Sequence, residues 1–320
     1  MSGGASTEAA ARARRVLFVC DAGGHLMEAV EIARTHFEAC EQRWHTADTP
    51  MSRSLLAGRT VSFSKRRVVP ARADLAAREL VAALRLLRRM DVDTVVSTGS
   101  AYAFPWLIAA RILRKQAIFV ESAARLSTQS KVGSLVARVP GVHRATQDPF
   151  RLDGWDVWPN VMVTALDGFE PRVAPSDDPP RVLVTVGTFE FPFQRLIDRI
   201  DKICPDEWDV TVQHGTATPP TRFDTAPTMP YEDVRAACRE VDVVIGHAGV
   251  GTVLTAADAG VQLILVPRRH EHGEMVDDHQ VELIAFLDRH DDITTIDDVD
   301  DLTAELVEVH VARARGAVAR

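Results

Sequence analysis

Short apolar runs alternate with glycine turns and helical patterns along this chain. In residues 243–267, VVIGHAGVGTVLTAADAGVQLILVP, an apolar run meets three glycines within six positions, followed by a small-residue helix and a second apolar run. Residues 14–37 and 179–203 show the same order of strand, glycine turn and amphipathic helix. Units of this kind begin Rossmann-like domains, so the pattern predicts two such domains.

Further strands are expected in both halves of the chain. They are short apolar or β-branched runs next to helical segments, at residues 91–98, 115–122, 208–215, 241–249 and 261–267. Strands that alternate with helices at this spacing predict an α/β fold with parallel sheets covered on both faces. Residues 72–90 predict a basic amphipathic helix, and residues 296–318 predict a C-terminal helix whose packing partner the sequence leaves open.

Composition indicates where the domains begin and end. Residues 1–14 have no apolar run after their arginines, which predicts a mobile tail and not a signal peptide. Residues 166–180 are rich in proline and aspartate and predict a linker. We therefore expect a first domain over residues 15–165 and a second over residues 181–320.

The charge of the chain is divided unevenly. The net charge of the 320 residues is −8, but residues 1–160 contain 23 Lys or Arg against 15 Asp or Glu. The negative net charge argues against general nucleic-acid binding, although the first half is basic and the second strongly acidic. A basic half suggests an anionic partner such as phospholipid headgroups or a lipid phosphate. An arginine-rich composition without any such partner is the alternative.

Cysteine content and hydropathy indicate the redox compartment of the protein and its relation to a membrane. The four cysteines are scattered without a short-spaced pair, which fits a reducing cytoplasm and neither a disulfide scaffold nor a zinc site. The longest apolar stretch, AYAFPWLIAARIL, contains proline and arginine and is too short to span a bilayer. Contact with a membrane surface is compatible with this pattern, and crossing is not expected.

The glycine loops are the main candidates for binding. In doubly wound domains, ligands bind beyond the carboxyl ends of the strands, and two such domains place these ends across a cleft. The loop GHAGVG lacks the spacing of dinucleotide-binding and P-loop motifs, but its backbone N–H groups suit a diphosphate. An ordinary turn with a solvated polar face is the alternative for each motif taken alone.

Five motifs in order resemble one group of enzymes. HAGVGTVLTAADAGVQLILVPRRHEHGEMVDDHQVEL and VLVTVGTFEFPFQRLI are similar to the donor half of family 28 GT-B glycosyltransferases, which include the peptidoglycan and dolichol-linked GlcNAc transferases. VLFVCDAGGHLMEAV, VVSTGSAYAFPWLIAARIL and IFVESAARLST resemble the membrane-recruiting acceptor half. The chain resembles a fusion of the two-subunit exopolysaccharide pair of this type.

The resemblance implies a GT-B fold and a set of donor-binding residues in the second domain. Within that set, Met229 and Tyr231 match only by position, and Asp258 matches the ribose-binding acid of the exopolysaccharide branch, where the peptidoglycan branch has glutamate in place of Thr255. Phe189 and Phe191 depart from the polar residues common in relatives. The expected donor-binding residues are Gly187, Thr188, Glu190, Gln213, Met229, Tyr231, His247, Gly249, Val250, Gly251, Thr252, Asp258, Asp278, His279 and Gln280.

His25 is the candidate general base. It follows a Gly–Gly turn at a helix start, and a neutral imidazole there suits removal of a proton from an acceptor hydroxyl. Binding of the acceptor phosphate or capping of the helix is the alternative role for His25, and Asp21 and Glu121 are the fallback bases. The expected acceptor-binding residues are Gly23, Gly24, Gly99, Ser100, Ser122 and Arg125.

No metal or other cofactor is expected. The spacing of His270, Glu271, His272 and His279 fits no structural zinc pattern, and the acidic pairs 277–278 and 291–292 fall in polar segments. GT-B enzymes stabilise the leaving diphosphate with loop N–H groups and a helix N-terminus.

The sequence also suggests where a membrane surface would be met. The basic helix 72–89 with Lys65, Arg66 and Arg67 is a candidate for contact with anionic lipid, and residues 101–110 for insertion into the interface. A plain connecting helix beside a buried one is the alternative.

These observations lead to one main hypothesis and two alternatives. The main hypothesis is an inverting hexosyltransferase that moves a sugar from a UDP-sugar to a polyprenyl-diphosphate-linked saccharide, at the inner face of the cytoplasmic membrane. The alternatives are a UDP-sugar 2-epimerase of the same architecture and a non-catalytic nucleotide-sugar-binding subunit. The identity of the sugar stays open.

Overall fold

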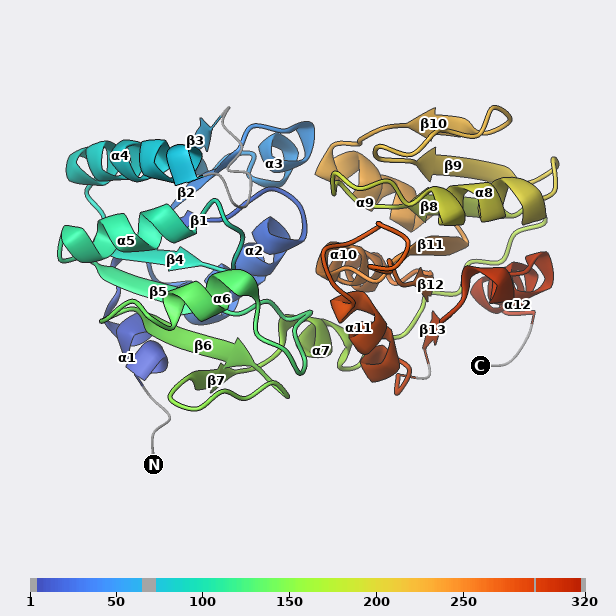
Figure 1. Cartoon of the computed structure of the whole chain (residues 1–320). Helices are drawn as coiled ribbons and strands as arrows, with labels where there is room; N and C mark the ends of the chain where they lie inside the picture. Colours follow the sequence, from blue (N-terminus) through green and yellow to red (C-terminus); the bar gives the residue numbers. More distant parts are fainter. Residues whose placement is uncertain (1–4, 65–72, 291, 318–320) are drawn as a thin grey trace. The chain divides into compact units, whose positions relative to one another are not determined.

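The chain folds into two compact units, Met1–Val161 and Met162–Arg320. The structure, a computed structural model, describes residues 5–64, 73–290 and 292–317 (Figure 1). Lys65, Arg66 and Arg67, named above for contact with lipid, lie outside the described residues, as does Asp291.

Unit 1 is built on a seven-stranded sheet in which all paired strands run parallel. The strand order is β3-β2-β1-β4-β5-β6-β7, and the order reverses between β1 and β4. This is the doubly wound Rossmann order. The strands are β1 (Arg15–Val19), β2 (Glu41–Ala47), β3 (Thr60–Ser64), β4 (Thr94–Ser97), β5 (Gln116–Val120), β6 (His143–Gln147) and β7 (Asp156–Trp158).

Helices cover both faces of the unit 1 sheet because alternate strand residues point to opposite sides. Leu17 and Val19 of β1 share a buried cluster with residues of α4, α5 and α6, whereas Phe18 stacks against Trp44 and meets Phe37 at the end of α2. The helices are α1 (Ala5–Arg12), α2 (Gly24–His36), α3 (Pro50–Leu55), α4 (Ala73–Arg89), α5 (Phe104–Ile112), α6 (Lys131–Val136) and α7 (Val161–Leu166), of which α7 spans the boundary between the units.

Unit 2 repeats the design with six strands in the order β10-β9-β8-β11-β12-β13, and every pair is parallel. The order reverses between β8 and β11. The strands are β8 (Arg181–Thr185), β9 (Asp209–Gln213), β10 (Asp224–Ala226), β11 (Val243–His247), β12 (Gln262–Val266) and β13 (Ile293–Thr295). The prediction of an α/β fold with two Rossmann-like parallel sheets is confirmed.

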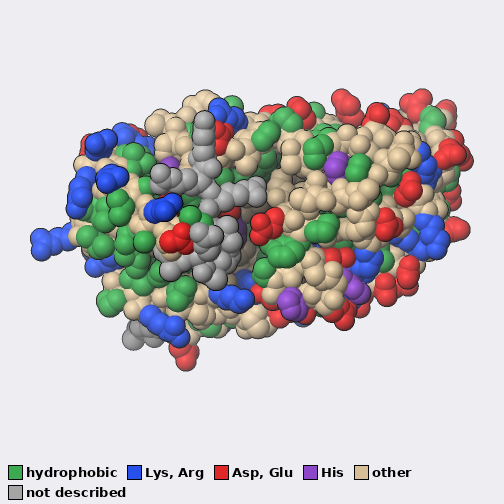
Figure 2. All heavy atoms as spheres, turned by 45° about the horizontal axis from the view of Figure 1, so that its top comes forward, with side chains coloured by type: hydrophobic (Ala, Val, Ile, Leu, Met, Phe, Trp, Pro, Cys, Tyr) green, Lys and Arg blue, Asp and Glu red, His purple; other side chains and the backbone are tan. Residues whose placement is uncertain are grey.

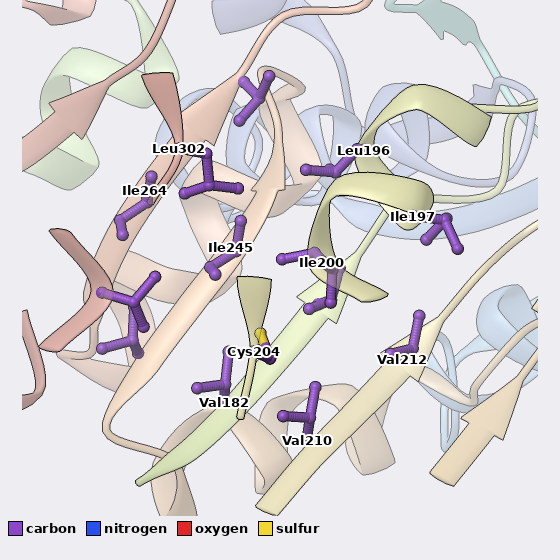
Figure 3. Close-up of a cluster of buried hydrophobic side chains, with 14 of the residues drawn as sticks. Val182, Leu196, Ile197, Ile200, Cys204, Val210, Val212, Ile245, Ile264 and Leu302 are labelled. Carbon is purple, nitrogen blue, oxygen red and sulfur yellow. The ribbon is translucent and has the colours of Figure 1, made fainter. Parts of the chain in front are cut away.

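The core of unit 2 lies between its sheet and helix α8. Leu196 and Ile200 of α8 pack over Val182 of β8 and its neighbours, and Leu302 closes the same cluster (Figure 3). The helices of this unit are α8 (Gln194–Ile203), α9 (Tyr231–Glu240), α10 (Val250–Ala259), α11 (His279–Leu287), the 3-10 turn η1 (Val299–Asp301) and α12 (Ala304–Ala314).

The prediction of a mobile tail over residues 1–14 is wrong for its described part. Residues 5–12 form α1, and Ala9, Ala10 and Ala13 are buried. Alanine has the highest helix propensity, and these small side chains allow α1 to pack closely on β6. The alanines of this segment were therefore a signal for a helix, which the prediction overlooked because it considered only the lack of an apolar run.

The linker and the C-terminal helix both pack on unit 2. The backbone of Arg172 donates to the carbonyl of Gly260 at 2.7 Å, and the backbone of Ala174 donates to Ala314 at 2.7 Å. Helix α12 contacts β11 and β12, where buried His310 lies 3.0 Å from Gln262 and 2.8 Å from Thr294. The structure thus assigns α12 to the second sheet, a point that the sequence left open.

Candidate active site

The site candidates lie where the strand order of each sheet reverses. In unit 1 this point lies between the carboxyl ends of β1 and β4, and in unit 2 between those of β8 and β11. The connections from such neighbouring strands run in opposite directions, which opens a crevice above the strand ends. Each of these points in this protein carries one histidine and one glycine in contact.

In unit 2, the loop after β8 closes over His247. Gly187 has φ of 72°, and a Cβ atom built on it would lie 2.6 Å from Cε1 of His247. A Cβ atom on Gly249 would collide with Nε2 of the same ring. Glycine is therefore required at both positions for steric reasons, and at Gly187 also for the left-handed backbone.

The imidazole of His247 is held neutral. Its Nδ1 lies 3.1 Å from the hydroxyl of Thr252. Burial is the main cause that lowers the pKa of His247 to about 3, and the nearby charge of Arg268 lowers it further. At neutral pH the ring is a hydrogen-bonding group without charge beside the start of α10.

The N-terminus of α10 offers backbone donors next to this ring. Gly249 is the N-cap residue, and no side chain accepts a hydrogen bond from the first turn. The helix continues for 10 residues, so its dipole is fully developed at this end. A glycine N-cap without a capping side chain leaves room for an anion to approach these N–H groups.

Arg268 organises the loop that follows β8. Its side chain is 1% exposed, and its guanidinium donates to the carbonyls of Val186 and Phe191, each at 2.7 Å. Burial lowers the pKa of Arg268 to about 10, so the group stays charged at neutral pH. The buried cation thus shapes the loop of Gly187 and adds positive potential near the N-terminus of α10.

Unit 1 has a corresponding contact between a histidine and a glycine. Here the histidine follows the earlier strand and the glycine follows the later one, the reverse of the order in unit 2. His25 lies in the first turn of α2, after β1, and a Cβ atom on Gly99, after β4, would lie 2.8 Å from Cε1 of His25. Gly99 and Ser100 have φ of 127° and 70°. A left-handed serine is uncommon, and such strain gathers at functional sites. Thr98 completes the arrangement by donating to the carbonyl of His25 at 2.7 Å.

A family model matches the second unit. Residues 181–288, which run from β8 to the end of α11, match the glycosyltransferase family 28 C-terminal domain. Relatives named UDP-N-acetylglucosamine--N-acetylmuramyl-(pentapeptide) pyrophosphoryl-undecaprenol N-acetylglucosamine transferase extend the similarity to both units. The chain is a glycosyltransferase with the GT-B fold.

Two such relatives illustrate the extent of the match. The protein from Acinetobacter baumannii is 24% identical over 306 residues, covering 85% of this chain and 81% of its own. The protein from Acinetobacter baylyi is 26% identical over 310 residues with the same coverage. Among solved structures, MurG from Acinetobacter baumannii covers 95% of both chains with a TM-score of 0.55 and 20% identity, which supports the fold.

The fold of unit 2 brings part of the expected donor-binding residues together. Gly187, His247, Gly249 and Thr252 meet as described above, and Val250 and Gly251 form the first turn of α10. Gln213 is buried beneath this loop, where its Oε1 accepts from the hydroxyl of Thr185 at 2.5 Å. Gln280 is also buried, and its Oε1 accepts from the backbone of Arg268 at 3.0 Å.

Other expected donor residues lie at the borders of this group. Asp278 accepts from the backbone of His270 at 2.8 Å, and His279 pairs with Asp277. Thr188 and Glu190 are exposed on the loop after β8. Met229 and Tyr231 are partly buried between β10 and α9. Each of these roles stays a prediction.

Asp258, expected as the ribose-binding acid, lies nine residues after Gly249 along α10, about 13 Å at 1.5 Å per residue, and this role stays a prediction. Its exposed carboxylate pairs with Arg239 at 3.0 Å and Arg235 at 3.9 Å, both on α9. Thr255 bonds to the carbonyl of Gly251 within its own helix.

The fallback bases Glu121 and Asp21 both accept hydrogen bonds within unit 1. Glu121 is 1% exposed, and its Oε2 accepts from the backbone and hydroxyl of Ser130, both at 3.1 Å. Asp21 is partly buried and accepts from the backbone of Ala22 at 2.9 Å. Glu121 thus holds the loop before α6, and the role of each candidate base stays a prediction.

The expected acceptor residues lie on the glycine turn after β1, the loop after β4 described above and the loop after β5. Gly23 caps α2 with φ of 96°, and Gly24 begins the helix. Ser122 donates to the buried carboxyl of Glu28 at 3.1 Å, and Arg125 lies close enough to Glu121 to influence its carboxyl. Ser122 therefore connects its loop to α2.

Two residues of the site were missed by sequence reasoning. Arg268 directly follows Pro267 at the end of an apolar strand, a place where a charged residue is exceptional. Glu28 stands three residues after His25, so the two lie on one helix face. Both signals were visible in the sequence, but only burial shows that they differ from surface charges.

Proposed function

We propose that this glycosyltransferase moves N-acetylglucosamine from UDP-N-acetylglucosamine to a polyprenyl-diphosphate-linked saccharide in cell-envelope or exopolysaccharide synthesis. The observation that carries the proposal is the coincidence of the family 28 match with the loop of His247, Gly249 and the α10 N-terminus. The donor and the class of acceptor are inferred from the names of the relatives.

The second unit binds the donor. The diphosphate accepts hydrogen bonds from backbone N–H groups at Val250, Gly251 and Thr252, and the neutral ring of His247 adds a polar contact without a competing charge. The helix dipole of α10 and the cation of Arg268 stabilise the charge that builds up on the departing UDP. Gln280 and Asp278 contact the sugar. No metal ion takes part in this proposal.

The first unit binds and activates the acceptor. The acceptor hydroxyl attacks the anomeric carbon of the sugar while His25 removes its proton. The new bond joins the acceptor oxygen to that carbon, the bond to the UDP oxygen breaks, and UDP leaves with the electron pair. Direct displacement from the opposite side inverts the configuration at the anomeric carbon. Gly23, Gly24, Gly99 and Ser100 shape the seat of the acceptor.

Helix α4 faces a membrane surface in this proposal. Arg78, Arg85 and Arg89 lie on one side of the helix. Val81 of α4 is 43% exposed, and Ile112 at the end of the neighbouring α5 is 55% exposed. Figure 2, which turns the α4 side forward, shows Lys and Arg side chains next to hydrophobic ones on unit 1. Such a mixed surface suits the interface of an anionic bilayer.

The protein is thus peripheral to the inner face of the cytoplasmic membrane in this proposal. Among the residues that the structure describes, none of the helices has the length and apolar character that a membrane crossing requires.

The order of acceptor half and donor half also supports the view that the chain is a fused form of a two-subunit exopolysaccharide transferase.

A panel of UDP-sugars with a membrane lipid extract tests the proposed function. We expect radiolabel from UDP-N-acetylglucosamine to enter the lipid fraction, with UDP released in equal amount. Conversion of the free UDP-sugar without a labelled lipid would favour the 2-epimerase. Binding of UDP without turnover of any sugar would favour a non-catalytic subunit.

A further inference from the structure

Glu28 is a buried carboxyl one helical turn after His25. It is 0% exposed, and three groups donate hydrogen bonds to it from other parts of unit 1. The backbone of Ala123 donates at 2.8 Å, the hydroxyl of Ser122 at 3.1 Å, and the side-chain amide of Gln147 completes the set. A carboxyl in this position carries a large desolvation cost, which needs a structural reason.

The two oxygens of Glu28 have different partners. Oε1 accepts from the backbone of Ala123 and from Nε2 of Gln147. The amide of Gln147 cannot reverse, because its own Oε1 accepts from the backbone of Val161 at 3.0 Å. Oε2 accepts from Ser122 and lies 3.9 Å from Nδ1 of His25. The hydrogen-bond directions of the network therefore point Oε2 toward His25.

The orientation of the His25 ring complements this arrangement. Nδ1 is buried, whereas 35% of the side chain is exposed. Gly99 lies against the ring at Cε1. Nδ1 thus faces the interior of unit 1, and Nε2 is the nitrogen that would meet the acceptor hydroxyl in the proposed reaction. A contact of 3.9 Å is longer than a hydrogen bond, and contacts between a base and its orienting group are commonly long in structures without substrate.

We propose that Glu28 is a positioning residue that keeps the proton of neutral His25 on Nδ1, so that Nε2 carries the lone pair that accepts the proton of the acceptor hydroxyl. This inference rests on the proposed role of His25 in sugar transfer. When Nε2 becomes protonated, the ionised carboxyl of Glu28 also stabilises the imidazolium.

The ionisation of Glu28 adds a pH dependence to the reaction. The titratable groups that face it are His25 on its own helix, Glu121 at the end of β5 and Cys20 after β1. Burial is the largest cause that raises the pKa of Glu28 to about 8, and the charge of Glu121 adds to it. Only the ionised carboxyl accepts from Nδ1, so we expect the rate of transfer to rise with pH through about 8.

Glu28→Gln is a sharp test because its amide would have one permitted orientation. The amide oxygen must take the place of Oε1, which accepts two N–H groups. The amide NH2 then takes the place of Oε2 and donates toward Nδ1 of His25. The proton of the neutral ring moves to Nε2, so His25 can no longer accept a proton there. The side chain at position 28 keeps nearly the same volume.

The experiment combines kinetics with nitrogen NMR of histidine side chains in the full chain. We expect Glu28→Gln to lower kcat by about 100-fold, in the range of general-base effects, with little change in KM for UDP-N-acetylglucosamine. The rise of rate near pH 8 should disappear. At pH 9, the His25 signal, assigned among the 11 histidines by its loss in His25→Ala, should change from the Nδ1–H to the Nε2–H tautomer.

Glu79→Gln is the matched control. Glu79 is another buried carboxyl of unit 1, 3% exposed, and it accepts from Nε1 of Trp106 at 2.9 Å on α5. This variant should keep the rate, the pH profile and the His25 tautomer of the natural protein. Equal tautomers at position 25 in the natural protein and Glu28→Gln, or an unchanged pH profile, would overturn the inference.

The NMR comparison separates this inference from the proposed function. If the natural protein moves no sugar to lipid, the proposed function fails, and the tautomer of His25 still decides whether Glu28 positions the ring. If the natural protein transfers sugar and Glu28→Gln transfers it equally well, the role of Glu28 alone is refuted.

Discussion

The ring of His247 occupies the space that any side chain at Gly187 would need. An ideal Cβ atom on Gly187 would lie 2.6 Å from Cε1 of the ring. In unit 1, Gly99 and His25 make the corresponding contact at 2.8 Å, although the histidine there follows the first strand of the sheet and the glycine the fourth. Both contacts arise from the same cause, the close approach of two loops where the strand order reverses.

Gly187→Ala should weaken UDP binding through this contact. The new methyl group displaces His247, and we expect at least about a tenfold loss of affinity, or 1.4 kcal/mol, by calorimetry. Gly168→Ala is the control, because Gly168 has φ of 73° against 72° at Gly187 and nothing within 4 Å of its Cβ position. Both variants lose about 1 kcal/mol of unfolding free energy to backbone strain. Equal UDP affinity in the two would contradict the role of the contact.

His25→Ala should abolish sugar transfer and leave UDP binding intact. Loss of a general base costs about 10²- to 10⁴-fold in rate, whereas the proposed donor contacts lie in unit 2. The rate of label transfer to lipid and the dissociation constant of UDP are measured on the same preparation. Normal transfer by this variant would show that another group removes the proton.

Arg268→Lys should loosen the loop after β8. A lysine retains the charge but cannot donate to the carbonyls of Val186 and Phe191 together, so at least one buried carbonyl loses its partner. We expect a loss of about 2 kcal/mol in unfolding free energy by urea titration, together with weaker UDP binding.

Arg269→Lys is the control for that change. Arg269 is 21% exposed at the side chain and pairs with Asp297 at 2.7 Å on the surface. Its replacement should change the unfolding free energy by less than about 1 kcal/mol. Unaltered UDP binding in Arg268→Lys would mean that the loop keeps its shape without the guanidinium.

The buried carboxyl of Glu28 should make stability fall as pH rises. The pKa of Glu28 is about 8 in the folded protein and near 4.5 in the unfolded chain, so the folded state holds the extra proton between these values. The contribution is fully present below pH 4.5 and is lost as pH rises to about 8, with a slope of up to about 1.4 kcal/mol per pH unit.

Urea titrations of the natural protein and Glu28→Gln at pH 5 and pH 9 measure this contribution. The natural protein should lose more unfolding free energy between these values than the variant, which has no proton to release at position 28. Parallel losses in both proteins would show that the carboxyl ionises freely in the folded state.

Reversal of charge on α4 should weaken binding to anionic vesicles. Arg85→Glu with Arg89→Glu replaces attraction by repulsion, and each arginine near such a surface contributes about 1 kcal/mol. Co-sedimentation with phosphatidylglycerol vesicles measures the effect, which should shrink at high salt. Arg12→Glu with Arg151→Glu gives the same change of charge at residues 69% and 68% exposed at the side chain, on α1 and between β6 and β7. Equal loss of binding in both double variants would refute a specific α4 surface.

The sequence determined the main helices and strands and the glycine turns that follow some of the strands. The apolar runs of residues 241–249 and 261–267 became β11 and β12, and residues 72–90 contain α4. These predictions succeed because a strand buried on both faces of a parallel sheet must be apolar, a requirement that is visible within a few neighbouring residues.

Tertiary structure alone decided which side chains meet. The contact of His247 with Gly187 joins residues 60 positions apart, and that of Glu28 with Gln147 joins residues 119 apart. Asp258 and Arg268 are both charged residues that follow the glycine loop in the sequence. In the structure Asp258 is exposed, whereas Arg268 is buried, with 1% of its surface exposed. Burial depends on the packing of distant elements, which the local pattern of a chain does not contain.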